Sequence, residues 1–370
     1  MSVVRRLAAP PGKLALRALV ATRTATWPAH SRLFALGDGA GWSVEEDAAH
    51  LAVTAARLGY EVGPGSWARF ASSQCVFLTS HFEALAPRWL DSSHRLGTAY
   101  LHGRPGTPGA PEFDEAFDAL RGRPERVARI QVTHAEMHDL VLDAAVPPER
   151  VFLIPIGIDL QRFPLGGADA RARARARLGL PEGAFVAGSF QKDGVGWGEG
   201  LEPKLVKGPD VLVRALERLR DLAPELHVLL TGPARGYVRG ELERLGIPHV
   251  HRLARSREEL AAAYHALDVY LVASRQEGGP KAVLEAMATG VPVVSTRVGQ
   301  AQEMIEDGVD GWLVEIEDVE ALAGRAAAVR DGAPAPFRDA AHAKAERFAL
   351  ERLDPLWARL LDGFVDREGS

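Results

Sequence analysis

The sequence predicts an α/β protein with two halves, each built on a parallel sheet covered by helices. Three observations lead to this fold class. Apolar, β-branched stretches alternate with helical patterns along most of the chain, which is typical of parallel sheets. The alternation occurs twice, and a charged, alanine-rich stretch at 168–177 separates the two series. The length of 370 residues is sufficient for two domains of ordinary size.

Composition excludes several classes of protein. Hydrophobic residues make up 46% and charged residues 25% of the chain, as in globular proteins that work in water. The net charge of -5 gives no reason to expect a nucleic-acid partner. The single cysteine, Cys75, excludes an internal disulfide and a cysteine-rich zinc site. No apolar run approaches the roughly 18–20 residues of a membrane span. We therefore expect a cytoplasmic protein with no metal and no bound cofactor.

The N-terminal extension, 1–30, is basic. No acidic residue precedes Leu36, whereas basic and leucine residues are interleaved there. One interpretation is an amphipathic segment that contacts anionic lipid at the inner face of the membrane. The other is a frayed extension, which Pro10, Pro11 and Gly12 favour because they interrupt any helix.

The first half is expected to span residues 1–162. Ser43 and Glu46 form a capping box that predicts a helix to about Leu58. A glycine turn at 37–41 precedes this helix. Strands are predicted at 33–36, 60–62, 75–78, 98–101, 130–133 and 151–154.

The second half is expected at 163–336, and a helical tail follows at 337–370. The stretch 168–177 is interpreted as the linker region, with partial helical structure allowed. Helices are predicted at 256–267 and 282–289. Strands are predicted at 186–189, 227–230, 249–253, 269–273, 291–295 and 312–314. Because ligands bind at the carboxyl ends of parallel strands, we expect a site in a cleft between the halves.

The most informative motif follows the strand predicted at 269–273. Gly278 and Gly279 allow a ligand to approach the backbone closely, and Pro280 suits a first helical turn. The N-terminus of the following helix would then attract an anion such as a diphosphate. Glu277 precedes this helix and Glu285 lies inside it, so the two carboxylates are placed to hold hydroxyls at separate points of one ligand.

The sequence around this motif resembles a known family. Residues 268–314 read Asp-Val-Tyr-Leu-Val-Ala-Ser, then the glutamate pair, Ala-Met-Ala-Thr-Gly-Val-Pro-Val-Val-Ser-Thr and Gly-Trp-Leu-Val. This segment resembles the donor-binding domain of family 4 of the retaining glycosyltransferases. Their fold is GT-B, in which two Rossmann-like domains face each other across a cleft. Residues 151–159 and Phe163 resemble the interdomain signature, with Ile156 in place of the usual asparagine. The resemblance covers roughly residues 130–330.

The resemblance implies roles for particular residues of the second half. Glu277 would sit at the donor sugar and Glu285 at the nucleotide ribose. The backbone of Gly278, Gly279, Pro280 and Lys281 would meet the sugar and diphosphate, and Leu253 is also assigned to donor binding. Lys207, in a lysine-glycine motif, would neutralise the leaving diphosphate.

The chain departs from the family pattern after its first strand in this half. An arginine usual in the family is missing there, so Lys192 is the first substitute and Gln191 the second. The glycine-rich insert that follows, 193–202, is either a mobile flap over the donor or a surface loop.

Candidates in the first half are a glycine loop and two histidines. Gly41 lies in a turn that resembles the family's glycine loop near the diphosphate and acceptor. A dinucleotide fingerprint fails there, because its third glycine is Trp42. His102 aligns better than His81 with a family histidine near the reacting carbon. The alternative for each is a structural histidine.

These features predict transfer of a sugar from a UDP- or GDP-sugar to the hydroxyl of an unidentified acceptor. Retention of anomeric configuration is implied by the resemblance alone. No Asp-x-Asp sequence occurs, so we expect activity without metal. Two alternatives remain: an epimerase of the same fold, and a non-catalytic subunit that binds sugar nucleotides, which the missing arginine favours. The resemblance also implies that the tail from Phe337 packs back on the N-terminal domain.

Overall fold

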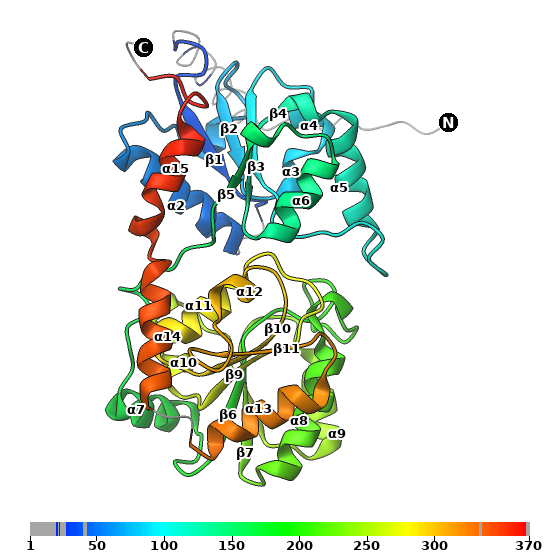
Figure 1. Ribbon diagram of the computed structural model, residues 1–370, viewed down its shortest axis with the longest axis vertical. Coiled ribbons are helices and arrows are strands. Elements are labelled where there is room, and N and C mark those ends of the chain that lie inside the picture. Colours follow the sequence, from blue (N-terminus) through cyan, green and yellow to red (C-terminus); the bar gives the residue numbers. More distant parts are fainter. Residues whose placement is uncertain (1–19, 21, 23–26, 40–42, 333–334, 368–370) are drawn as a thin grey trace, which may run out of the picture. The chain divides into compact units, whose positions relative to one another are not determined.

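The computed structural model describes residues 20, 22, 27–39, 43–332 and 335–367 (Figure 1). Gly41 and most of the basic extension lie outside these residues. Contacts divide the chain into two compact units. Unit 1 comprises the chain up to Val132, His138–Ile154 and the end of the chain from Asp354. Unit 2 comprises Thr133–Met137 and Pro155–Leu353.

Unit 1 is built on a parallel sheet whose strand order follows the sequence. Helices cover it, and the first turn of α6 groups with unit 2. The strands are β1 (Leu33–Leu36), β2 (Cys75–Leu78), β3 (Arg95–Ala99), β4 (Val127–Val132) and β5 (Val151–Leu153). The helices are α2 (Ser43–Arg57), α3 (His81–Ala84), α4 (Pro87–Leu90), α5 (Pro111–Gly122), α6 (Ala135–Asp143) and α15 (Asp354–Leu361).

The strand predicted at 60–62 is wrong. Only one bridge forms there, between Val62 and Leu33 of β1. Gly63 and Pro64 follow directly, and proline has no N–H to extend a ladder. The chain turns instead into a short 3-10 helix, η1 (Gly65–Trp67).

The buried cysteine of β2 provides a test of unit 1. The Cys75 thiol is fully buried and donates to the carbonyl oxygen of Phe364 at 2.8 Å. Burial raises its pKa to about 12, so the reactive thiolate is scarce in the folded protein. We expect a maleimide to label the folded chain at least about 100-fold more slowly than the chain in denaturant. Labelling followed by mass spectrometry measures this ratio, and equal rates would contradict the burial.

Unit 2 is built on a second parallel sheet with the order β11-β10-β9-β6-β7-β8. Its first strand, β6, therefore pairs with both β7 and β9, and the strand order reverses between β6 and β9. Such a reversal opens a crevice at the carboxyl ends of the strands. The strands are β6 (Phe185–Ser189), β7 (Leu226–Leu230), β8 (His249–His251), β9 (Val269–Val272), β10 (Val293–Thr296) and β11 (Trp312–Val314).

Helices cover both faces of the unit 2 sheet (Figure 1). Their apolar side chains form two separate cores, one on each face. On one face lie α7 (Ala168–Leu178), α10 (Arg257–His265), α11 (Lys281–Thr289), α12 (Ala301–Met304) and α14 (Ala335–Arg347). On the other lie α8 (Pro209–Leu222), α9 (Gly236–Leu245) and α13 (Val319–Arg330). The predicted fold class of two parallel α/β halves is confirmed.

The stretch interpreted as a linker is helix α7 of unit 2. Arg175 of this helix is buried and donates to the carbonyl oxygen of Ala266 at 3.0 Å and to the Asp268 carboxylate at 2.6 Å. Arg171 of the same helix also pairs with Asp268, so two arginines of this stretch bind the residue that precedes β9.

The C-terminal tail is shared by the two units. Phe337 stacks on Trp312 with ring centroids 4.3 Å apart, and α14 packs on α11 in unit 2. The chain leaves unit 2 through a 3-10 helix, η5 (Leu350–Leu353). Beyond it, Leu360, Leu361 and Phe364 enter the core of unit 1.

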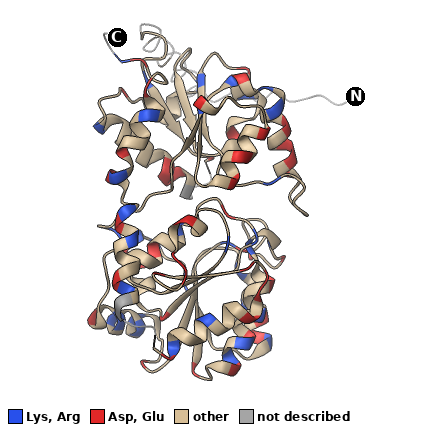
Figure 2. Cartoon of the chain, viewed as in Figure 1, with Lys and Arg blue, Asp and Glu red and all other residues tan. Residues whose placement is uncertain are grey.

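Charged side chains are distributed over both units. Figure 2 shows Lys and Arg interspersed with Asp and Glu along the helices of each. Within the described residues, every helix is too short or too polar to cross a bilayer.

Candidate functional site

A lysine and a glutamate meet at the carboxyl edge of the unit 2 sheet, near the point where the strand order reverses between β6 and β9. Lys207 Nζ lies 2.6 Å from Glu277 Oε2. The Ser274 hydroxyl donates to Glu277 Oε1 at 2.7 Å. The Glu277 side chain is 9% exposed and that of Lys207 is 26% exposed. Both residues were predicted as site residues, and the structure brings them into direct contact.

Lys207 is positioned by the turn that starts α8. It ends the 3-10 helix η4 (Leu205–Lys207), and its carbonyl oxygen accepts from Gln191 Nε2 at 3.1 Å. The next residue, Gly208, has a φ of 61°, and a Cβ there would lie 1.9 Å from the Ala273 carbonyl oxygen. Only glycine fits this turn. The glycine of the lysine-glycine motif is thus required by the close approach of this turn to the end of β9.

Gly278 and Gly279 lie close to Thr133 and Ile156, which belong to earlier segments of unit 2. The Gly278 carbonyl oxygen accepts from the Thr133 hydroxyl at 3.0 Å and from the Gln300 backbone N–H at 2.9 Å. A Cβ on Gly279 would lie 2.4 Å from Ile156 Cδ1. Helix α11 begins after Pro280 without a side-chain cap. Its N-terminus carries partial positive charge, which favours a bound anion.

Gln300 was missed by the sequence analysis. It is buried, accepts from the Ile156 N–H at 2.7 Å and donates to the Ile156 carbonyl oxygen at 3.1 Å. The available signal was a glutamine directly after Gly299, at the carboxyl end of β10. The Gln300 amide thus fixes the backbone at Ile156.

The second glutamate has partners of its own. Glu285 Oε2 accepts from the Tyr264 hydroxyl at 2.8 Å, and Oε1 lies 3.5 Å from Arg257 Nη1. Burial raises the pKa of Tyr264 well above its ordinary value, so the phenol keeps its proton and donates it. Sequence reasoning did not identify Tyr264, because its spacing is that of a core aromatic residue.

Two further predicted residues lie at loops of the same sheet edge. Lys192 Nζ lies 4.6 Å from the Trp197 ring centroid. Burial and the charge of Lys207 lower the pKa of Lys192. Leu253, after β8, is 59% exposed and lines a cavity of about 250 Å³ with Thr231, which follows β7.

The histidines have mainly aromatic surroundings. In unit 1, His81 is buried with its ring 3.9 Å from that of Phe82 and 4.1 Å from that of Tyr100. Burial lowers the pKa of His81 well below its ordinary value. His102 lies edge-on to His81 at 5.7 Å. In unit 2, buried His134 lies 3.0 Å from the Thr133 hydroxyl. Roles for His102 and Gly41 at the donor stay predictions.

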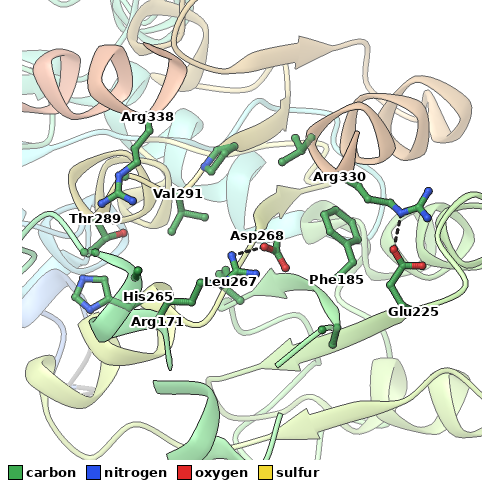
Figure 3. A pocket seen from close by; sticks show the side chains of 18 residues that line it. Arg171, Phe185, Glu225, His265, Leu267, Asp268, Thr289, Val291, Arg330 and Arg338 are labelled. Atoms are coloured by element: carbon green, nitrogen blue, oxygen red, sulfur yellow. Dashed lines mark hydrogen bonds and ion pairs between the residues drawn. The ribbon is translucent and has the colours of Figure 1, made fainter. Parts of the chain in front are cut away.

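A larger cavity of about 580 Å³ lies at the opposite edge of the unit 2 sheet, where β6, β9 and β10 begin (Figure 3). Arg171 pairs with Asp268, and Arg330 pairs with Glu225. The predicted site residues do not line this cavity, and these two ion pairs neutralise much of its charge. In the described part of the chain, no three His, Cys, Asp or Glu side chains are grouped to hold a metal ion.

Comparison with solved structures defines the class of fold. An Anabaena protein, HepE, crystallised with UDP and glucose, matches with a TM-score of 0.71 at 18% identity, over 90% of this chain and 99% of its own. Sucrose-phosphate synthase of Thermosynechococcus elongatus matches with a TM-score of 0.67 at 19% identity, over 91% of this chain and 99% of its own. The two units therefore have the GT-B fold.

Sequence comparison shows which proteins the chain is similar to. Residues 198–330 match the family model described as Glycosyl transferases group 1. D-inositol 3-phosphate glycosyltransferase 1 of Catenulispora acidiphila is 33% identical over 248 residues, which are 62% of this chain and 55% of that protein. A D-inositol 3-phosphate glycosyltransferase of Streptomyces bingchenggensis is 33% identical over 281 residues, 68% of this chain and 58% of that protein. The chain thus spans little more than half the length of these relatives. The matched residues are therefore similar to the glycosyl transferases of group 1.

Proposed function

We propose that this protein transfers a sugar from a nucleotide-diphosphate sugar to the hydroxyl of an acceptor, with retention of configuration and without a metal ion. The observation that carries the proposal is the Lys207–Glu277 pair beside the N-terminus of α11. A cation, a carboxylate and a helix N-terminus at one crevice suit a ligand that has both hydroxyls and phosphate.

The proposed chemistry divides charge between these groups. The bond from the anomeric carbon to the phosphate oxygen breaks, the acceptor oxygen bonds to the same carbon, and the acceptor's proton passes to the departing phosphate oxygen. Positive charge develops on the sugar and negative charge on the departing diphosphate. Lys207 and the N-terminus of α11 stabilise the diphosphate. Glu277 exchanges its contact with Lys207 for hydroxyls of the sugar.

In this proposal the nucleotide part of the donor binds to residues near the Lys207–Glu277 pair. Glu285, which Tyr264 orients, accepts from the ribose hydroxyls. The base enters the cavity lined by Leu253 and Thr231. UDP is the first nucleotide to test because HepE was crystallised with UDP. GDP remains the alternative.

The acceptor and the location of the protein are open to experiment. D-inositol 3-phosphate is the first acceptor to test, since the relatives are named for it. A cytoplasmic location and contact of residues 1–30 with the inner face of the membrane stay predictions.

The experiment measures donor binding and turnover with EDTA present, across UDP-, GDP- and ADP-sugars. We expect one donor to bind and turn over, and Glu277→Gln to lower turnover by at least about 100-fold. Glu243→Gln, an exposed carboxylate of α9, is the matched control and should retain activity. Proton NMR of the product reports the anomeric configuration.

The other outcomes have defined meanings. Donor binding without turnover in the presence of acceptors would favour a non-catalytic subunit. Conversion of the sugar nucleotide to an isomer without an acceptor would favour an epimerase. Loss of turnover in EDTA would contradict metal independence.

A further inference from the structure

The glycine-rich insert after β6 forms a hairpin, which we define as residues 193–204. Gly194 and Pro203 form an antiparallel bridge. The N–H of Val195 donates to the Glu202 carbonyl oxygen at 2.8 Å, and that of Lys204 donates to the Asp193 carbonyl oxygen at 2.8 Å. The insert at 193–202 was interpreted as a flap or a surface loop. Its first three residues and Glu202 are thus held by backbone contacts across the hairpin.

A buried ion pair fixes the base of the hairpin. Arg235 Nε lies 3.0 Å from Asp193 Oδ1, and both side chains have an exposed fraction of 0%. Arg235 Nη1 also donates to the carbonyl oxygens of three residues at the ends of β6 and β7, at 2.6–3.0 Å: Ser189, Gln191 and Thr231. Arg235 is therefore held inside the protein and is not placed to reach a ligand.

The far part of the hairpin is also bound to the start of α9. The N–H of Gly236 donates to the Glu199 carbonyl oxygen at 2.7 Å, and that of Tyr237 donates to the Gly200 carbonyl oxygen at 2.9 Å. A Cβ on Gly200 would lie 2.3 Å from the Ala234 carbonyl oxygen. The hairpin consequently presents its side chains from a fixed backbone.

One of these side chains is Trp197, which is 61% exposed. Its ring holds the Lys192 ammonium at 4.6 Å from the centroid. Gln191, the residue before Lys192, donates from Nε2 to the Lys207 carbonyl oxygen at 3.1 Å, so the two lysines come from adjoining segments. Burial and the charge of Lys207 lower the pKa of Lys192. The negative face of an indole attracts an ammonium group and so offsets this repulsion.

We propose that Trp197 is a positioning residue that holds Lys192 beside Lys207, so that the two ammonium groups form the cationic site for the donor diphosphate. The inference rests on the proposed function. It explains how the chain provides a second cation although the arginine usual at the end of β6 is missing. A compact ammonium on a flexible stem is less preorganised than a guanidinium, and the indole restricts it.

A double-mutant cycle tests this role, with the dissociation constant for UDP measured by calorimetry on the full chain at low salt. We expect Lys192→Met to raise the constant about tenfold. Trp197→Ala should raise it roughly three- to fivefold, and Trp197→Phe should restore most of the affinity. In the Lys192→Met background, Trp197→Ala should add less than about twofold. Leu201→Ala, on the same hairpin and 69% exposed, is the matched control.

Two results would overturn the inference. The first is no effect of Trp197→Ala on UDP affinity. The second is an additive effect in the double variant, which would mean that the indole contacts a ligand without Lys192. If the wild-type chain binds neither UDP nor GDP, the proposed function fails, and the inference that rests on it fails with it. Fluorescence provides a second readout: UDP should change the emission of Trp197, obtained as wild type minus Trp197→Phe, and this change should be lost in Lys192→Met.

Discussion

Replacing Lys207 by methionine should lower kcat by about two to three orders of magnitude, the usual effect of removing one preorganised group from a developing oxyanion. Methionine keeps most of the volume and removes the charge. The ammonium lies 2.6 Å from Glu277, at the edge where the diphosphate is proposed to depart. Its interaction grows as negative charge develops on the leaving group, so kcat should fall more than donor affinity does.

Steady-state kinetics and UDP calorimetry together measure this separation of effects. Lys207→Arg keeps a cation and should recover part of kcat. Arg214→Met, on the same α8 helix with a side chain 55% exposed, is the control for a lost surface charge and should stay near wild type. A fall in kcat of less than tenfold would remove Lys207 from the leaving-group role.

Replacing Arg235 by methionine should destabilise the protein by about 3–5 kcal/mol, the usual cost of leaving one partner of a buried ion pair alone. Asp193 would stay in its fully buried position without its cation, and three carbonyl oxygens would lose a donor. Burial already raises the pKa of Asp193 against the opposing effect of Arg235. Without Arg235 this pKa should rise further.

The pH dependence of this variant follows from linkage. A carboxyl whose folded pKa lies above its unfolded pKa takes up a proton on folding. The free energy of unfolding of the protein therefore falls as the pH rises. The stability gap between Arg235→Met and wild type should therefore be smaller at about pH 5 than at about pH 8. Urea denaturation at both pH values measures it. The control is Arg218→Met, an exposed pair with Glu320, which should leave the midpoint unchanged. A gap that widens at low pH would contradict the assignment.

The fold could be predicted because parallel strands buried on both faces have a clear apolar pattern. The errors in the predicted strand boundaries occur where a proline or a charged residue lies at the start of a strand. β10 begins at Val293 and not at Val291, because Pro292 lacks an N–H. β3 begins at Arg95, earlier than predicted, because a charged residue masks its start. The side chain of Arg95 donates to the carbonyl oxygen of Phe364, 269 residues away in sequence.

The candidate site was predictable only where a short local motif determines the position of its residues. Glycine, lysine and glutamate near a helix start are visible in sequence, and Lys207 and Glu277 do meet. Arg235 and Gln300 were missed because their partners lie far along the chain: Gln300 binds Ile156 across 144 residues. Nothing local distinguishes such a side chain from a polar surface residue.

The position of β6 at the centre of its sheet has a consequence for folding. β6 can pair with β7 soon after synthesis, but its other edge waits for β9, and the Val186 N–H reaches Asp268 across 82 residues. Contacts this distant form slowly, and until then β6 has an open edge that can pair with another chain. Lys207 and Glu277 come together through this same late closure. Nucleotide binding should therefore appear only at the last step of refolding, and ligands added early should not rescue chains that aggregate before it.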